Sequence, residues 1–382
     1  MAKARMFTIA PGVPFLKGLA RDVLDDSFAL GIDARNPLSL ARATVYLPTR
    51  RSATAFAEAM ADEIRLRTGQ SAALLPRILP LGGLDEAEVD LLATGLDGAG
   101  AGLPPAIAPL RRRMLLARQI EAWGRTVNRS ILGLDAAHFR LVPERLGEAV
   151  GLAAHLAELI DTLHSSNVAF EALARLDVTR HDRLWEFTHG FLAIAGQWWP
   201  KILEAEGALD PADRRNRLIE AECARIRAGR LEGPVIAAGS TGSVPATARL
   251  LSAIAQSPRG AVVLPGLDIW LDEASWATLN EGAGAGHDAA ISHPQAVMAR
   301  LMHGMGLERS GIVSLAEAEP ALQARARLVS EALRPAATTD LWQLAATHLA
   351  HDTCADAMEG VTLVEADDER EEALAIALVL RE

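Results

Sequence analysis

Short apolar runs followed by helix-spaced apolar positions open the chain. The first run, RMFTIA, is closed by Pro11 and Gly12, and the second ends at Pro48 before a longer helical pattern. Strands are expected at residues 5–10, 43–47 and 72–81, and helices at 13–25 and 52–68. Buried strands that alternate with helices in this way predict a parallel α/β sheet.

The pattern changes over residues 85–229, where long alanine and leucine periodicities replace the β-branched runs. This stretch is expected to be helical, and the Gly-, Ala- and Pro-rich segment 95–109 is expected to connect it flexibly to the sheet. Strand character returns at 234–238 and 261–264, on either side of a helical pattern at 245–256. This order predicts an α/β domain that resumes after a helical insertion.

The C-terminal part predicts a helix at 294–304, a strand at 361–365 (VTLVE) and a helix from Glu369 onward. No Gly, Pro or capping residue follows Leu380, so we expect the sequence to have been cut within a larger protein. We predict four parts, namely the first half of an α/β domain (1–95), a helical insertion (96–230), the second half of that domain (231–355) and the start of a second one (356–382).

Composition narrows the classes of protein that fit the chain. Half of the 382 residues are apolar, no run is long enough to cross a membrane and no secretion signal is recognisable, so we expect a cytoplasmic protein without membrane partners. The formal net charge of -11 argues against bulk attraction to nucleic acid, so any DNA contact has to be local. Cys223 and Cys354 are too few for a disulfide framework or a thiolate metal site.

The turn after the first strand is where an α/β protein would hold nucleotide phosphates. A P-loop requires G-x-x-x-x-G-K-[ST], whereas residues 12–18 read GVPFLKG. Lys17 precedes Gly18 instead of following a glycine, no Ser or Thr is present to hold magnesium, and Pro14 removes one backbone N–H. The turn predicts a structural helix start and no bound cofactor.

Catalytic chemistry finds little support elsewhere in the sequence. An ATPase needs carboxylates at the end of a buried strand, but GSTGS at 239–243 has none. Asp85 and Glu86 follow the third strand, in what looks like a solvated acidic helix start. No G-x-S-x-G elbow or complete metal-ligand set occurs, so we expect no catalytic residue and no metal.

Taken together, these segments resemble the N-terminal half of AddB proteins of the alphaproteobacterial type, which are subunits of the AddAB helicase-nuclease. The resemblance spans the whole chain and depends on six segments that occur in order at comparable spacing. They are 7–15 (FTIAPGVPF), 45–53 (VYLPTRRSA), 75–82 (LPRILPLG), 238–251 (AGSTGSVPATARLL), 293–295 (HPQ) and 364–377 (VEADDEREEALAIA).

The resemblance implies a superfamily 1 helicase fold, in which a RecA-like parallel sheet is interrupted by an all-helical inserted domain and followed by the start of a second RecA-like domain. It also implies that both nucleotide-binding motifs are lost here and that motor activity resides in the partner, AddA. The complex processes DNA double-strand breaks for recombinational repair, so single-stranded and forked DNA are the implied ligands. Family members carry a C-terminal nuclease domain, often with an iron-sulfur cluster, which this chain does not supply.

The second strand leads into its helix through Thr49, Arg50, Arg51 and Ser52, where a helicase-like domain would meet single-stranded DNA. Hydroxyls, helix N-terminal amides and two positive charges suit a phosphate group. The same four residues also suit a capped helix that carries two solvated arginines. The sequence leaves both interpretations open.

Two further sets are candidate DNA contacts. Ser240 and Thr241 follow a strand at the carboxyl edge of the predicted sheet, where they suit either a ligand-binding turn or an ordinary capped one. Arg111, Arg112 and Arg113 start a helix of the insertion and suit either a DNA backbone or a solvated helix face.

Tryptophans in the helical stretch suit either packing in a core or stacking on nucleic-acid bases. Trp185, Trp198 and Trp199 stand at helical spacing among apolar residues, which favours core packing over base stacking.

Three functions follow from these observations. The leading hypothesis is a non-catalytic, helicase-like scaffold that helps AddA hold and split duplex ends. The second is an α/β enzyme that binds a nucleotide or nucleotide-sugar at its first turn. The third is a pure protein-interaction module that docks a partner through the helical insertion.

Overall fold

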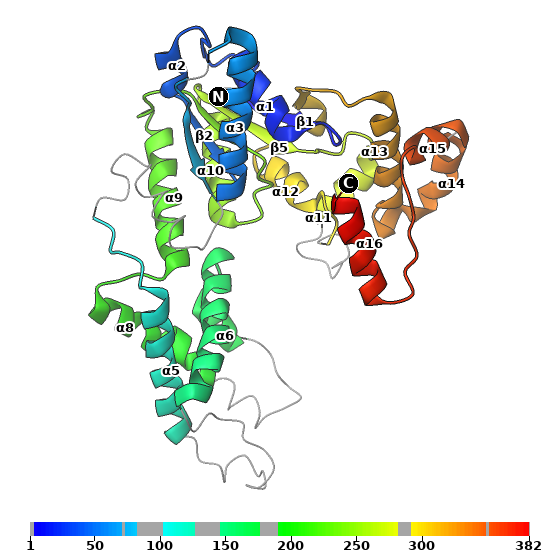
Figure 1. The fold of residues 1–382 in the computed structure, drawn as a ribbon. Helices are drawn as coiled ribbons and strands as arrows, with labels where there is room; N and C mark the ends of the chain where they lie inside the picture. The colour runs from blue at the N-terminus through cyan, green and yellow to red at the C-terminus, as the bar shows by residue number, and fades with distance from the viewer. Residues whose placement is uncertain are drawn as a thin grey trace. The chain divides into compact units, whose positions relative to one another are not determined.

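The described strands form one parallel sheet. The computed structural model describes residues 4–70, 73–81, 102–126, 146–175, 190–281, 292–348 and 351–381. Their six strands lie in the order β3-β2-β4-β5-β1-β6, and every pairing is parallel. Figure 1 labels β1, β2 and β5 of this sheet. The strands are β1 (Met6–Ile9), β2 (Thr44–Leu47), β3 (Arg77–Pro80), β4 (Val235–Ala238), β5 (Gly260–Pro265) and β6 (Val313–Ser314). The α/β class predicted from the sequence is confirmed.

Helices make up most of the remaining described chain. Several helices lie between successive strands of the sheet along the chain. They include α1 (Phe15–Leu24), α2 (Pro37–Ala41), α3 (Arg50–Thr68), α10 (Pro245–Gln256) and α12 (Ala296–Gly304). Between β3 and β4 lie α5 (Pro109–Thr126), α6 (Leu146–Ser165), the short helices η2 (Phe170–Arg175) and η3 (Ile194–Trp198), α8 (Trp199–Glu206) and α9 (Pro211–Arg227). The others are α11 (Glu273–Glu281), α13 (Pro320–Ala332), α14 (Trp342–His348), α15 (His351–Met358) and α16 (Glu369–Arg381). Among described helices, none has the length and apolar character needed to span a bilayer.

The chain divides into two compact units. The first comprises residues 1–9, 14–266 and 300–316. It contains both the sheet and the helices α5 to α9. The second comprises residues 10–13, 267–299 and 317–382. By their contacts, the helices of the expected insertion belong to the same unit as the sheet. The boundaries at 95 and 230 stay a prediction.

The order of the strands places helices on both faces of the sheet. Connections between parallel strands are right-handed, so those that run toward β3 cover one face and those that run toward β6 cover the other. The helices α1 and α3 follow β1 and β2 and pack against each other (Figure 1). In the opposite direction, α10 joins β4 to β5 and packs against α9. Strands covered on both faces have to be apolar throughout, as β2 and β4 are.

Local sequence accounts for both ends of α3 and for the start of α10. Thr49 caps α3, and its hydroxyl accepts a hydrogen bond from the Ser52 N–H at 3.1 Å. Gly69 ends α3 in the left-handed conformation that glycine adopts without strain. For α10, Pro245 occupies the first helical position, and the helix spans the residues that the sequence predicted.

A buried polar network fastens α9 to the sheet. The Tyr46 hydroxyl of β2 donates a hydrogen bond of 2.8 Å to the Glu222 carboxylate of α9. Glu222 is fully buried, and the Arg225 guanidinium donates to both of its oxygens at 2.7 and 2.9 Å. Because each buried polar group has a charged or hydroxyl partner, the network stabilises the contact between sheet and helix.

Tyr46 is the one tyrosine in the sequence, so its titration can be followed directly. Burial, with the neighbouring Glu222 charge and hydrogen bond, raises the pKa of the Tyr46 phenol well above its usual 10.0. The unfolded chain loses this proton first, so the contribution of Tyr46 to stability is complete below pH 10 and falls as the pH rises further. We expect absorbance at the phenolate band to stay flat through pH 10 in the folded protein. In denaturant it should rise near pH 10, and a rise there in both states would contradict the buried hydroxyl.

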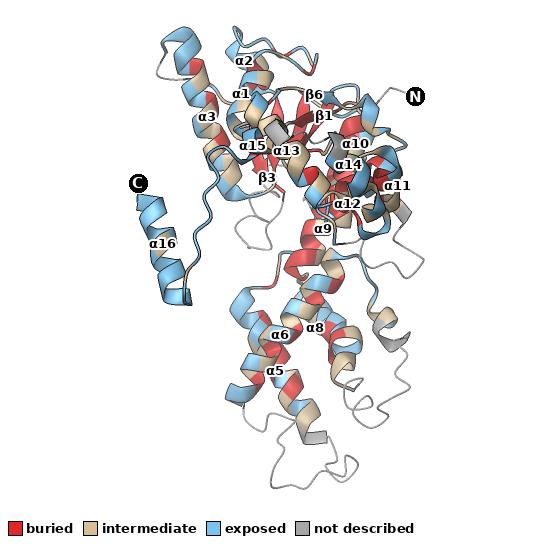
Figure 2. Cartoon of the chain, turned by 90° about the vertical axis from the view of Figure 1, so that its right-hand side faces the viewer, coloured by how far each residue is buried: buried red, intermediate tan, exposed pale blue. Residues whose placement is uncertain are grey.

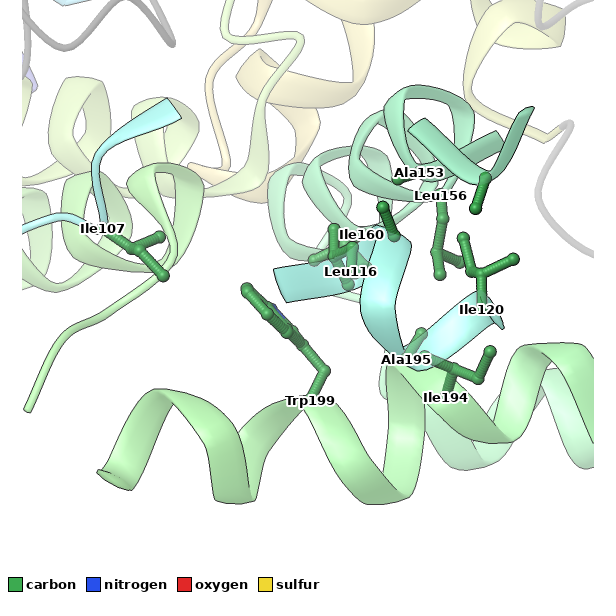
Figure 3. Packing of buried hydrophobic residues seen from close by; sticks show 11 residues of the cluster. Ile107, Leu116, Ile120, Ala153, Leu156, Ile160, Ile194, Ala195 and Trp199 are labelled. Carbon is green, nitrogen blue, oxygen red and sulfur yellow. The ribbon is translucent and has the colours of Figure 1, made fainter. Parts of the chain in front are cut away.

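The helices between β3 and β4 enclose an apolar core of their own. Leu116 and Ile120 of α5 face Leu156 and Ile160 of α6, with Trp199 against them (Figure 3). Trp199 is buried, as the sequence predicted, whereas Trp198 is 55% exposed with the Lys201 ammonium 5.4 Å from its ring centroid. The third tryptophan of the predicted set, at position 185, lies outside the described residues.

The predicted strand at 361–365 is wrong. These residues form no strand, and the apolar side chains of Val361, Leu363 and Val364 are exposed. A strand needs a neighbour to receive its backbone hydrogen bonds, and among the described strands none pairs with this segment. The helix predicted from Glu369 is confirmed as α16, and most of its residues have the colour of exposed residues in Figure 2. Propensity along the chain therefore identified the helix but not the pairing that a strand requires.

Candidate nucleic-acid interface at the carboxyl edge of the sheet

Two turns leave the sheet next to each other at its carboxyl edge. Tyr46 of β2 pairs with Ala237 of β4, so the residues after each strand emerge side by side. The chain leaves β2 toward β3 and leaves β4 toward β5, in opposite directions along the sheet. Adjacent strands whose connections diverge in this way mark the position where open α/β sheets bind ligands.

Contacts around Gly239 bring three segments together at this edge. Gly239 has a φ of +76°, and a Cβ placed on it would lie 3.3 Å from the Phe15 ring and 3.4 Å from Pro48 Cδ. A side chain at this position would therefore be strained and would crowd both neighbours. The start of α1, the end of β2 and the turn after β4 thus meet at one place.

The Thr49 to Ser52 turn forms a closed capping box. The Thr49 N–H donates to the Ser52 hydroxyl at 3.0 Å, and the Ser52 N–H donates to the Thr49 hydroxyl at 3.1 Å. Arg50 and Arg51 follow on the exposed surface. The capped-helix interpretation is therefore confirmed for the two hydroxyls. The exposed arginines and the positive end of the helix dipole remain suited to an anion.

The turn after β4 offers hydroxyls and an uncapped helix. Ser240 and Thr241 are half-buried, and the Ser240 hydroxyl accepts a hydrogen bond from the Gly242 N–H at 3.3 Å. At the start of α10 the N-cap residue, Val244, has no side chain that can cap the first turn. The first-turn N–H groups of α10 accordingly point their partial positive charge toward the same edge as α3.

The first turn of the chain is packed against by a residue of α13. Gly12 has a φ of +88°, and a Cβ on it would lie 3.0 Å from Cδ1 of Leu322, a residue of α13. The Leu322 side chain therefore packs against the turn at Gly12. Lys17 is exposed within α1. The helix predicted to follow this turn is confirmed as α1, and the absence of a bound cofactor stays a prediction.

The three arginines of the helical stretch are separated by the fold. Arg111 is exposed and donates to Glu206 at 2.8 Å, and Arg113 is exposed. The prediction that all three lie on a solvated face or against DNA is wrong for Arg112, which is buried and donates to both Asp161 oxygens at 2.8 and 2.9 Å. Its guanidinium is committed to structural ion pairs, because a buried charge has to be paired.

Buried Asp210 is the second partner of Arg112. The Arg112 Nε atom lies 2.9 Å from Asp210 Oδ1, close enough for an ion pair although the two atoms are not aligned for a hydrogen bond. The other Asp210 oxygen accepts a hydrogen bond of 2.9 Å from the Trp199 indole N–H and lies 3.4 Å from His164 Nε2. The sequence did not identify this cluster, although Asp210 before Pro211 has the pattern of a helix start.

Cys223 is not activated as a nucleophile, and the described residues include no cluster of metal ligands. Burial raises the pKa of the Cys223 thiol to about 11, so the thiol is protonated at neutral pH. Within the described ranges, no group of three or more His, Cys, Asp or Glu side chains is arranged to hold a metal ion. Asp85 and Glu86 lie outside the described residues.

Comparison with known proteins leaves the sequence resemblance untested. No protein-family model matches the chain, and a search of curated proteins finds no match.

Proposed function

We propose that this chain is a non-catalytic, helicase-like scaffold of the AddB type that holds a DNA strand at the carboxyl edge of its sheet. The observation that carries the proposal is the pair of turns after β2 and β4, which meet where the strand connections diverge. The RecA-like character of the sheet, the helicase type and the inserted nature of α5 to α9 are parts of the same proposal. The resemblance described above supports it.

Charge and exposure at this edge suit a phosphate backbone. Arg50 and Arg51 are exposed, and the N-termini of α3 and α10 direct partial positive charge to the same edge of the sheet. The formal net charge of the protein is -11, so attraction has to come from this local region. Contacts of this kind fix the position of a strand without reading its sequence, as guiding a separated strand requires.

The residues of the turns after β1 and β4 favour a scaffold over an enzyme. Leu322 packs on the turn after β1, and the turn after β4 carries hydroxyls in place of carboxylates. A helicase-like chain of this composition would depend on a partner for ATP hydrolysis, and we propose an AddA-type subunit in that role. Apolar side chains of α16, such as Leu374 and Leu380, are exposed and suit contact with another polypeptide.

The test is fluorescence anisotropy of labelled single-stranded and forked DNA, with the variant Arg50→Glu/Arg51→Glu. Reversing two charges beside the bound phosphates should weaken binding by at least about tenfold at low salt and make the salt dependence shallower. Arg35→Glu/Arg42→Glu provides the control, because both arginines are exposed, precede β2 in the chain and give the same change in net charge. We expect this control to lose much less affinity.

Equal affinity of both variants for DNA would eliminate the strand contact at this edge. Saturable ATP binding by the unaltered protein, lost in Gly12→Trp, would instead favour the enzyme hypothesis.

A further inference from the structure

A cavity of about 510 Å³ opens between the end of α6, η2, α8 and the first turns of α9. Its lining residues all belong to the first compact unit. The volume lies in the range of pockets that hold small organic molecules. None of the candidate DNA contacts at the sheet edge lines this cavity.

Aromatic and apolar side chains form much of its wall. Phe170, Trp199 and Leu203 line it together with His164. The rings of Phe170 and His164 meet edge to face, with centroids 5.5 Å apart and planes at 85°. The Trp199 indole N–H is already bonded to Asp210 and its ring is almost fully buried, so the accessible aromatic surface comes from Phe170 and His164. Such a wall favours a flat, apolar molecular face.

Hydrogen-bond donors and acceptors stand beside that wall. Asp213 and Arg217 line the cavity and form an ion pair of 3.0 Å, with side-chain exposures of 25% and 53%. Their charges cancel, whereas Asp210 shares the Arg112 guanidinium with Asp161, so the negative charge of Asp210 is only partly matched. Exposed Glu204 adds a negative charge, which disfavours a phosphate inside the cavity. The complementary ligand therefore carries no negative charge and has both donors and acceptors on its edge.

We infer that this cavity binds a nucleobase ring. A purine or pyrimidine offers a flat face for aromatic contact and an edge with both donors and acceptors, which carboxylate and guanidinium groups recognise. The ring would belong either to a free nucleoside or to an unstacked base of a DNA strand. The inference is independent of the strand contact proposed at the sheet edge.

The experiment measures adenosine and cytidine binding by isothermal titration calorimetry, and quenching of a single-stranded oligonucleotide that contains 2-aminopurine. Ala208→Trp would fill the cavity from its lining and should reduce nucleoside affinity by at least about tenfold. Asp213→Asn/Arg217→Gln removes the polar pair without changing net charge and should reduce it by about tenfold as well. Asp62→Asn/Arg65→Gln, which removes an exposed pair on α3, is the matched control and should bind normally.

Saturable nucleoside binding that both cavity variants lose identifies a site for the free molecule. Quenching of 2-aminopurine that both variants lose identifies a base of a strand. If the wild-type protein binds no nucleoside and quenches no 2-aminopurine, or if neither variant changes either signal, the cavity does not bind a nucleobase. Nucleoside binding combined with unchanged DNA affinity of Arg50→Glu/Arg51→Glu would retain this inference and reject the proposed function. Because the charge-neutral double variant lies on the half-exposed start of α9, it keeps the test valid even if Ala208→Trp misfolds.

Discussion

Asp210→Ala should lower the free energy of unfolding by about 3 to 5 kcal/mol, the range for breaking a buried ion pair on one side. The substitution leaves Arg112, which is buried, with Asp161 as its remaining carboxylate partner and removes the acceptor of the Trp199 indole N–H. Denaturant unfolding followed by far-ultraviolet circular dichroism measures the change, because α5, α6, α8 and α9 all meet near this residue.

Two comparisons make the Asp210 result specific. Asp210→Asn keeps an oxygen for the Trp199 indole but removes the charge opposite Arg112, so an intermediate loss is expected. Asp213→Ala, one turn along the same helix, breaks a half-exposed pair with Arg217 and should cost about 0 to 1 kcal/mol. Equal stability of Asp210→Ala and Asp213→Ala would contradict the buried network.

Glu222→Ala should lower the free energy of unfolding by about 2 to 4 kcal/mol, because two partners lose a fully buried acceptor at once. The Tyr46 hydroxyl and the Arg225 guanidinium both donate to this carboxylate. The expected result is a lower denaturant midpoint and loss of the raised pKa of Tyr46, with an unchanged dependence on denaturant concentration.

Matched variants separate the Glu222 network from a general effect on α9. Glu220→Ala removes a half-exposed carboxylate that pairs with Arg227 and Arg249, and about 0 to 1 kcal/mol is expected. Tyr46→Phe removes one donor but leaves the Arg225 pair intact, so about 1 to 2 kcal/mol is expected. Additive effects of Tyr46→Phe and Glu222→Ala would show that the two side chains do not interact.

The local pattern of the sequence was sufficient for most of the helices and strands around the sheet. The helix predicted at 245–256 has the same bounds as α10, because Pro245 fits only a first turn and apolar residues follow at helical spacing. The run at 261–264 became the core of β5, which is buried on both faces. These assignments depend on neighbours in sequence, so no tertiary contact was needed to make them.

The candidate interface could be predicted only in part. The sequence identified the turns after β2 and β4 separately, from strand ends followed by Thr, Ser and Arg. Their meeting depends on β2 lying between β3 and β4, an order that hydrophobic periodicity does not encode. The sequence also left open whether the Thr49 and Ser52 hydroxyls cap a helix or meet a phosphate. The hydrogen bonds of the capping box show that they cap α3.

The sequence by itself determined the α/β class, the absence of a P-loop pattern and the positions of the basic residues. Tertiary structure alone decided which of those residues stay in solvent. Arg111, Arg112 and Arg113 are identical in type and adjacent, yet Arg112 points to Asp161 and Asp210, which lie far along the chain. It also decided that VTLVE has no strand partner and that α6, α8 and α9 surround a cavity. The physical reason is the same throughout: burial and pairing are properties of contacts between distant segments, and only the folded chain brings those segments together.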